Sequence, residues 1–82
     1  MVFEFTNHAV EEMHRRQIER TQIESVLAAP EQKVPEYGDV LCYQSRVVMG
    51  GRSYLLRVMV DENTKKIVTV YRTSKIKKYW RS

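Results

Sequence analysis

The chain has 82 residues, of which 43% are hydrophobic and 29% charged, and its net charge is +4. This length allows one small domain covering residues 1–82, and the composition excludes a disordered chain. No apolar run approaches the roughly 20 residues of a membrane-spanning helix, and no secretory leader follows Met1, so we expect no membrane contact. The single cysteine, Cys42, excludes an internal disulfide and multi-cysteine metal sites, which favours a reducing, cytoplasmic location.

The first third of the chain predicts a lead-in and two helices. Residues 2–5 combine short and aromatic apolar residues with Glu4 and predict an edge strand or a segment that covers the core. Thr6 or Asn7 then suits the N-cap of a helix over residues 8–17. The apolar stripe of that helix is formed by Ala9, Val10, Met13 and Gln17, and the line along its edge by His8, Glu12 and Arg16.

A second helix is expected over residues 21–29. Thr21 followed by Glu24 has the spacing of a capping box, and Pro30 stops the helix. A polar connection follows, in which residues 33–37 predict a short strand.

Residues 40–73 predict a three-stranded antiparallel meander. The Gly50-Gly51 pair separates the first two β-rich runs and indicates a two-residue hairpin. This loop pairs Met49 with Arg52, and the register follows for both strands. For the third strand, pairing Val60 with Ile67 would put Tyr71 on the covered face and Arg72 on the open one, whereas a bulge would reverse that assignment.

These elements predict an α+β fold in which two N-terminal helices pack on one face of an antiparallel β-sheet. The other face is expected to be open and basic. Residues 1–39 carry eight acids against four Lys or Arg, whereas residues 40–82 carry two against ten. Residues 74–82 predict a last helical turn or a tail across the sheet. A basic surface with interleaved aromatic residues favours a nucleic-acid partner, and the alternative is a solvated charged face.

Metal-free acid–base chemistry on RNA suits the residue types better than metal or nucleophilic catalysis. His8 and His14 are six residues apart and no HExxH pattern occurs, so we predict neither a metal nor a cofactor. RNA carries its own nucleophile, and the protein needs a base, an acid and cations for the developing phosphorane charge. The candidate catalytic residues are His8, Arg57, Tyr71 and Lys75. The candidate nucleic-acid-binding residues are Arg16, Arg46, Arg72, Lys77, Lys78 and Tyr79.

Each candidate also has a structural interpretation. His8 can be an ordinary helix residue, Arg16 can pair with Glu12, Tyr71 can belong to the core, and the lysines can simply be solvated. Arg57 lies in mid-strand, where a charge is expected to face open solvent or a ligand.

The segments FTNHAVEEMHRRQIERTQIESVLAAPEQ and IVTVYRTSKIKKYW together resemble the domain-of-unknown-function family 4258. The resemblance rests on His8-Ala9, Arg16 and Ile18 near the start, and on Thr69–Tyr71, Thr73–Lys75 and Tyr79-Trp80 near the end. In that family an Arg is frequent at the position of Glu12 and a Gly at that of Gln17. The family is similar to RelE/ParE toxins of the barnase–EndoU–colicin–RelE fold group. The resemblance implies a toxin–antitoxin ribonuclease that acts on RNA or on the ribosome and has an antitoxin partner.

The sequence therefore predicts a RelE-like, metal-independent ribonuclease of the mRNA-interferase type. The first alternative is a non-catalytic module of the same fold that binds nucleic acid or an acidic protein. The second is a small homodimer formed through an exposed sheet edge.

Overall fold

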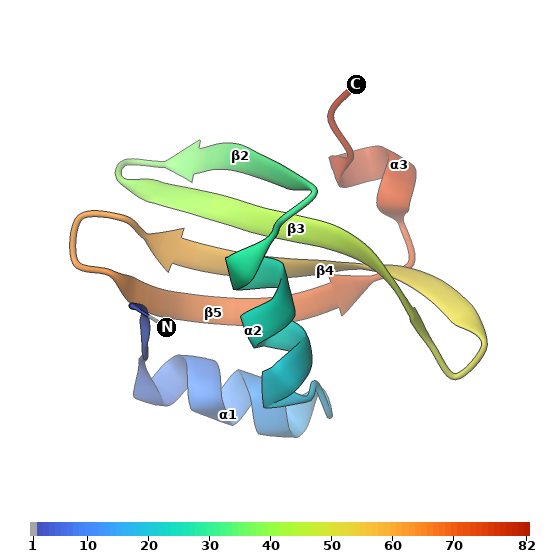
Figure 1. The fold of residues 1–82 in the computed structure, drawn as a ribbon, viewed down its shortest axis with the longest axis horizontal. Helices are drawn as coiled ribbons and strands as arrows, with labels where there is room; N and C mark the ends of the chain where they lie inside the picture. The colour runs from blue at the N-terminus through green and yellow to red at the C-terminus, as the bar shows by residue number, and fades with distance from the viewer. Residues whose placement is uncertain (1) are drawn as a thin grey trace.

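The computed structural model describes residues 2–82, which form a five-stranded sheet and three short helices (Figure 1). The strands are ordered β1-β5-β4-β3-β2 across the sheet. Their bounds are β1 Glu4–Phe5, β2 Gln32–Tyr37, β3 Val40–Met49, β4 Arg52–Asp61 and β5 Lys66–Thr73. The helices are α1 Asn7–Arg15, α2 Arg20–Ala28 and α3 Ile76–Tyr79. None of the helices formed by residues 2–82 is long and apolar enough to cross a membrane.

The β3–β4 hairpin confirms the predicted register along its whole length. Met49 pairs with Arg52 beside the turn, and Val40 pairs with Asp61 at the far end. Gly50 and Gly51 have φ of +59° and +75°, which a two-residue type I′ turn requires at both central positions. Glycine adopts these angles without a Cβ clash, so local chemistry alone determines this pairing.

A β-bulge in β5 decides the alternative that the sequence left open. Val60 pairs with Ile67, but Met59 pairs with Thr69, so Val68 is an extra residue in β5. Beyond the bulge the alternation is reversed. Tyr71 lies opposite Arg57 and shares its face, whereas Arg72 lies opposite Leu56 on the face that the N-terminal helices cover.

The prediction of an antiparallel sheet is wrong because β1 pairs in parallel with β5. Glu4 N–H donates to the Lys65 carbonyl at 2.9 Å, and Thr6 N–H donates to the Ile67 carbonyl at 3.2 Å. The Thr6 hydroxyl also donates to the Ile67 carbonyl at 2.8 Å and accepts from Ala9 N–H at 3.1 Å. Thr6 is thus the predicted N-cap of α1 and also joins that helix to β5.

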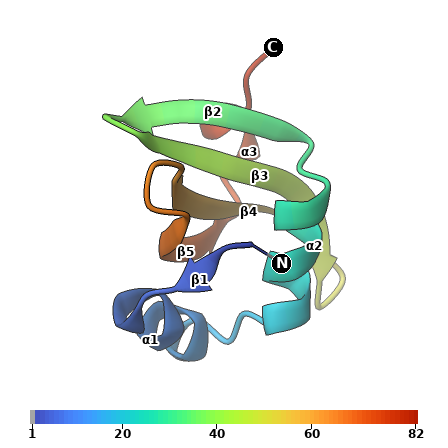
Figure 2. The ribbon, with the colours of Figure 1, turned by 60° about the vertical axis from the view of Figure 1, so that its left-hand side comes forward.

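The two N-terminal helices do not form the expected pair. Helix α1 packs along β5, and α2 packs on β4 and β3 (Figure 2). Their apolar residues share one core with the sheet, in which Ala9, Ile23, Leu56, Val60 and Ile67 are fully buried. Helix α2 begins at Arg20, one residue earlier than predicted, because its capping box is formed by Glu19 and Gln22 instead of Thr21 and Glu24.

The opposite sheet face is not open as predicted. A smaller cluster there contains Val34, Val40, Cys42 and Met59, with Val68 and Tyr71 packed against it. Helix α3 and the C-terminal residues lie beside this face, so the expectation of helices on one side only is also wrong (Figure 1). The α+β class itself is confirmed.

Candidate nucleic-acid interface

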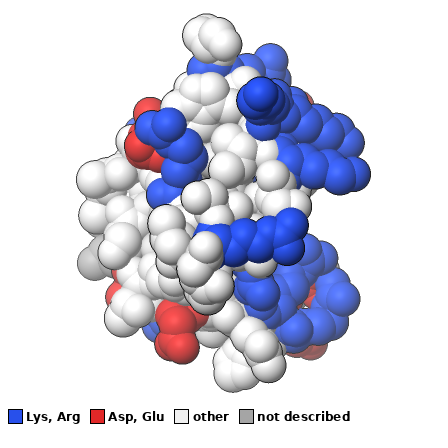
Figure 3. Space-filling view, turned by 90° about the vertical axis from the view of Figure 1, so that its right-hand side faces the viewer, with Lys and Arg blue, Asp and Glu red and all other residues white. Residues whose placement is uncertain are grey.

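Basic side chains gather at the end of the molecule where α1 and β5 terminate, where the β3–β4 turn lies and where α3 follows (Figures 1 and 3). In the view onto this end, Lys and Arg cover much of the surface, and Asp and Glu are visible at only a few places (Figure 3). We call it the basic end. Its side chains come from segments far apart in the sequence, so the fold concentrates charge that the linear sequence distributes over both halves.

Arg57 is buried, with 3% of its surface exposed, which contradicts the expectation that it faces solvent or a ligand. Its Nε donates to Gln44 Oε1 at 2.8 Å, its Nη1 donates to Tyr71 Oη at 2.5 Å, and its Nη2 forms an ion pair with Glu36. Glu36 lies at an irregularity in the β2–β3 pairing. The guanidinium is therefore held by three different strands, and this set of contacts is typical of a structural arginine.

Tyrosines flank Arg57 on the same side of the sheet. The Tyr79 ring centroid is 4.3 Å from Arg57 Cζ, and the Tyr71 ring centroid is 5.6 Å away. The two rings meet edge to face at 6.3 Å. Burial raises the pKa of Tyr71, and the hydrogen bond from Arg57 opposes that rise. The fold thus brings together three of the predicted site residues, Arg57, Tyr71 and Tyr79.

Three arginines surround a hollow of about 270 Å³, which is lined by Arg15, Arg16, Gln17 and Arg72. Arg72 Nη1 donates to the Arg16 carbonyl, and Arg16 Cζ lies 5.7 Å from the Tyr71 ring centroid. We call this the arginine hollow. Arg15 was not among the predicted residues, although the Arg15-Arg16 pair at a helix end was a visible signal.

Glu12 partly neutralises the arginine hollow. Its carboxylate lies 2.6 Å from Arg15 Nη2 and 2.8 Å from Arg16 Nη2. The hydrogen bond from Arg15 is the main cause that lowers the pKa of Glu12 to about 2, and Arg16 adds to it. With Arg72 included, three positive charges meet one negative charge, so the site remains cationic.

A second hollow of the basic end contains Arg46 and Trp80. It measures about 230 Å³ and is lined by Arg46, Ile76, Lys77, Trp80 and Ser82. Arg46 Cζ lies 4.5 Å from the Trp80 ring centroid, and its Nη2 forms a 3.0 Å ion pair with Glu31. Trp80 was not among the predicted binding residues, because nothing local indicates that Arg46 reaches it.

The remaining predicted residues lie outside these clusters. His8 is exposed in the first turn of α1, and the eight-residue separation from Arg16 corresponds to about 12 Å along a helix. Lys75 is exposed at the N-cap of α3, where its N–H donates to Thr73 Oγ1 at 3.0 Å. Lys78 is also exposed. The structure therefore does not place His8 beside Arg57 and Tyr71.

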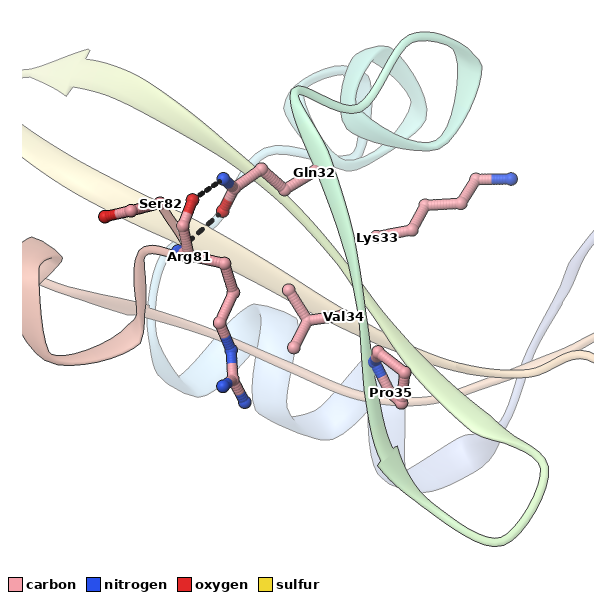
Figure 4. Close-up of a pocket in the computed structure, with 6 residues that line it drawn as sticks. All are labelled: Gln32, Lys33, Val34, Pro35, Arg81 and Ser82. Atoms are coloured by element: carbon pink, nitrogen blue, oxygen red, sulfur yellow. Dashed lines mark hydrogen bonds between the residues drawn. The ribbon is translucent and has the colours of Figure 1, made fainter.

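A third hollow, of about 640 Å³, lies along β2 and the C-terminal residues (Figure 4). Gln32 binds the main chain of Arg81 twice, accepting from its N–H at 3.1 Å and donating to its carbonyl. Lys33 points away from Arg81 (Figure 4). The two cations that line this hollow, Lys33 and Arg81, therefore point in different directions.

Within residues 2–82, no three His, Cys, Asp or Glu side chains are grouped so that they could hold a metal ion. Neither the curated proteins nor the solved structures contain a match to this chain. The model of one family, described as a domain of unknown function (DUF4258), matches residues 5–72, which is most of the chain. The chain belongs to this family.

Proposed function

We propose that this protein binds RNA through the phosphates that its basic end attracts. The observation that carries the proposal is the arginine hollow, which Arg15, Arg16 and Arg72 line together. Arginine presents a planar fork of donors that matches phosphate oxygens. A cluster of cations on one end of a small domain is the electrostatic signature of a polyanion-binding surface.

The arginines are also partly pre-ordered, which supports the proposal. The contact of Arg72 with the Arg16 carbonyl and the position of Arg16 beside Tyr71 limit the rotamers of both side chains. Less conformational entropy is then lost when a phosphate binds. Glu12 holds Arg15 and Arg16 together, and a phosphate can bind the donors that Glu12 leaves free.

The test is the salt dependence of RNA binding, measured by fluorescence anisotropy with a labelled single-stranded RNA. Removing one phosphate contact should reduce the slope of log K against log salt by about 0.7. We expect this change in Arg15→Gln and in Arg16→Gln. Lys66→Gln is the matched control, because Lys66 is exposed at the start of β5, about 20 Å along the strand from Arg72. No binding by the wild type, or equal slopes in all four proteins, would refute the proposal.

A second candidate is metal-independent RNA cleavage of the RelE/ParE toxin type, with the ribosome and an antitoxin as partners in the cytoplasm. One observation favours it: the Tyr71 hydroxyl binds Arg57, and the guanidinium of Arg16 lies beside the Tyr71 ring. A phenol that accepts a hydrogen bond from one arginine and has a second arginine beside its ring is a group that can move a proton next to a bound phosphate. In this proposal Arg57 positions Tyr71, and His8 and Lys75 are the further acid–base candidates.

Cleavage is tested in EDTA on free RNA and on translating ribosomes. Tyr71→Phe removes only the hydroxyl, so it should abolish cleavage and leave the salt slope of binding unchanged. His8→Ala tests the residue that lies apart from this cluster. Salt-sensitive binding without cleavage on either substrate would eliminate the nuclease and retain the binding module. The homodimer alternative is tested separately, by measuring the sedimentation coefficient of the protein at several concentrations.

A further inference from the structure

We infer that the hollow beside Trp80 is a stacking site for one unpaired base of single-stranded RNA. This inference rests on the proposed RNA binding and adds what part of the RNA is recognised. Trp80 is partly exposed at the C-cap of α3 and lines the hollow with Arg46 and Lys77. An aromatic ring beside cations is the arrangement with which proteins hold bases of single strands.

Fixed neighbours keep the Trp80 site in place. Glu31 binds the Arg46 guanidinium through Nε at 3.2 Å and Nη2 at 3.0 Å, and it also accepts from Arg46 N–H at 2.7 Å. Arg46 is thereby held 4.5 Å from the Trp80 ring centroid. Trp80 N–H donates to the Ile76 carbonyl at 2.8 Å, which fixes the main chain of Trp80 to α3.

The charges at this site suit a base with its adjoining phosphate. Glu31 offsets the charge of Arg46, whereas Lys77 is exposed and extends the cationic surface next to Trp80. The 230 Å³ of the hollow is below the about 300–1,000 Å³ of sites for drug-sized ligands, which suits a single planar ring system. A guanidinium or indole plane accepts any base, so the site selects unpaired bases without selecting a sequence.

The two hollows lie near the same end of the sheet. Arg46 is opposite Leu55 on β4, and Leu55 is opposite Thr73 on β5, directly after Arg72. Two strand spacings, about 10 Å, therefore separate β3 from β5 at this level, but Arg46 lies on the sheet face beside α3 and Arg72 lies on the face that the N-terminal helices cover. A single strand of a few nucleotides that passes around the end of the sheet can place a phosphate in the arginine hollow and a base against Trp80. A duplex cannot, because its bases stay stacked on one another.

Trp80 is the single tryptophan of the chain, so its fluorescence reports this site directly. Three probes of equal length are compared: a single-stranded RNA, a duplex, and an abasic strand that keeps the sugar–phosphate backbone. We expect the single-stranded RNA to quench Trp80 and the abasic strand to bind with the same salt slope without quenching. Trp80→Ala should weaken binding of the single-stranded RNA roughly 5- to 150-fold and leave the abasic strand unaffected. Tyr37→Ala is the matched control, since Tyr37 is 64% exposed and lies at the opposite end of β2 from the C-terminal residues.

The outcomes separate this inference from the function on which it rests. Salt-dependent RNA binding with no quenching, and with equal affinity in Trp80→Ala, would overturn the stacking site and leave phosphate binding intact. Quenching by the abasic strand as strong as by the complete strand would also overturn it. Trp80→Phe retains an aromatic face and should recover part of the affinity lost in Trp80→Ala, which excludes misfolding as the cause of the loss.

Discussion

Arg57 is predicted to stabilise the fold more than any exposed arginine of the chain. Arg57→Ala leaves the Glu36 carboxylate, the Gln44 amide oxygen and the Tyr71 hydroxyl without their donor. Breaking a buried ion pair by removing one partner costs about 3–5 kcal/mol. The lower end applies, because the Glu36 side chain is 27% exposed and water can solvate its carboxylate. A loss of about 3 kcal/mol is a large part of the about 5–15 kcal/mol that stabilises a typical domain.

The assay is urea unfolding followed by circular dichroism and by Trp80 fluorescence. Arg46→Ala is the matched control: Arg46 also forms an ion pair with a glutamate, but its side chain is 57% exposed, so its loss should cost about 0–1 kcal/mol. Combining Arg57→Met with Glu36→Gln should cost less than the sum of the two single changes, because no unpaired charge remains. An Arg57→Ala protein within about 1 kcal/mol of the wild type would refute the structural role, since the Glu36 carboxylate that loses its partner should cost more than this.

Three further predictions concern single sites. The pKa of Glu12 is lowered from 4.5 to about 2, so its ion pairs stabilise the fold above about pH 4.5, and acid titration should show this stability lost as the pH falls toward 2. Glu12→Gln should remove that part of the pH dependence. If the variant loses stability below pH 4.5 as the wild type does, the ion pairs of Glu12 are not its cause. Cys42 is fully buried, and burial raises the pKa of its thiol to about 11. Its alkylation at pH 8 should therefore occur only as fast as the protein opens, and rapid labelling of the native protein would contradict this. Gln17 has φ of +54°, so Gln17→Gly should raise the free energy of unfolding by about 0.5–1 kcal/mol in urea, and Gln17→Ala should not.

The β3–β4 hairpin was predictable because its determinants are local. The Gly50-Gly51 turn specifies the loop length, and the loop length specifies every pair along both strands. Thr6 was predictable as an N-cap for the same reason. The direction of β1 was not, since two residues carry no signal for parallel or antiparallel pairing, and the contact that decides it joins Thr6 to Ile67.

One residue, Val68, determines which side chains of β5 lie on which face of the sheet. Val68 is a good strand residue, and nothing in its type indicates that it is inserted between two paired positions. The bulge moves Tyr71 to the side of Arg57, and this explains how a mid-strand arginine can be buried at all: Tyr71 supplies an acceptor that the unbulged register would have placed on the other face. The partner Glu36 comes from β2, 21 residues earlier, so no local pattern could reveal it.

The buried network and the basic end are connected, which gives Arg57 a part in recognition without contact with RNA. Gln44 accepts from Arg57 and donates to the Tyr79 carbonyl at 3.2 Å, and the Tyr79 ring lies over Arg57. Both contacts hold α3 against the sheet, and Trp80 directly follows α3. The Trp80 site therefore depends on a core arginine, and Gln44→Leu should weaken binding of a complete RNA strand more than binding of the abasic strand. If binding of the complete RNA and binding of the abasic RNA weaken equally, other contacts hold α3 in place and the Trp80 site does not depend on Arg57. The proposal for the arginine hollow is unaffected by that result.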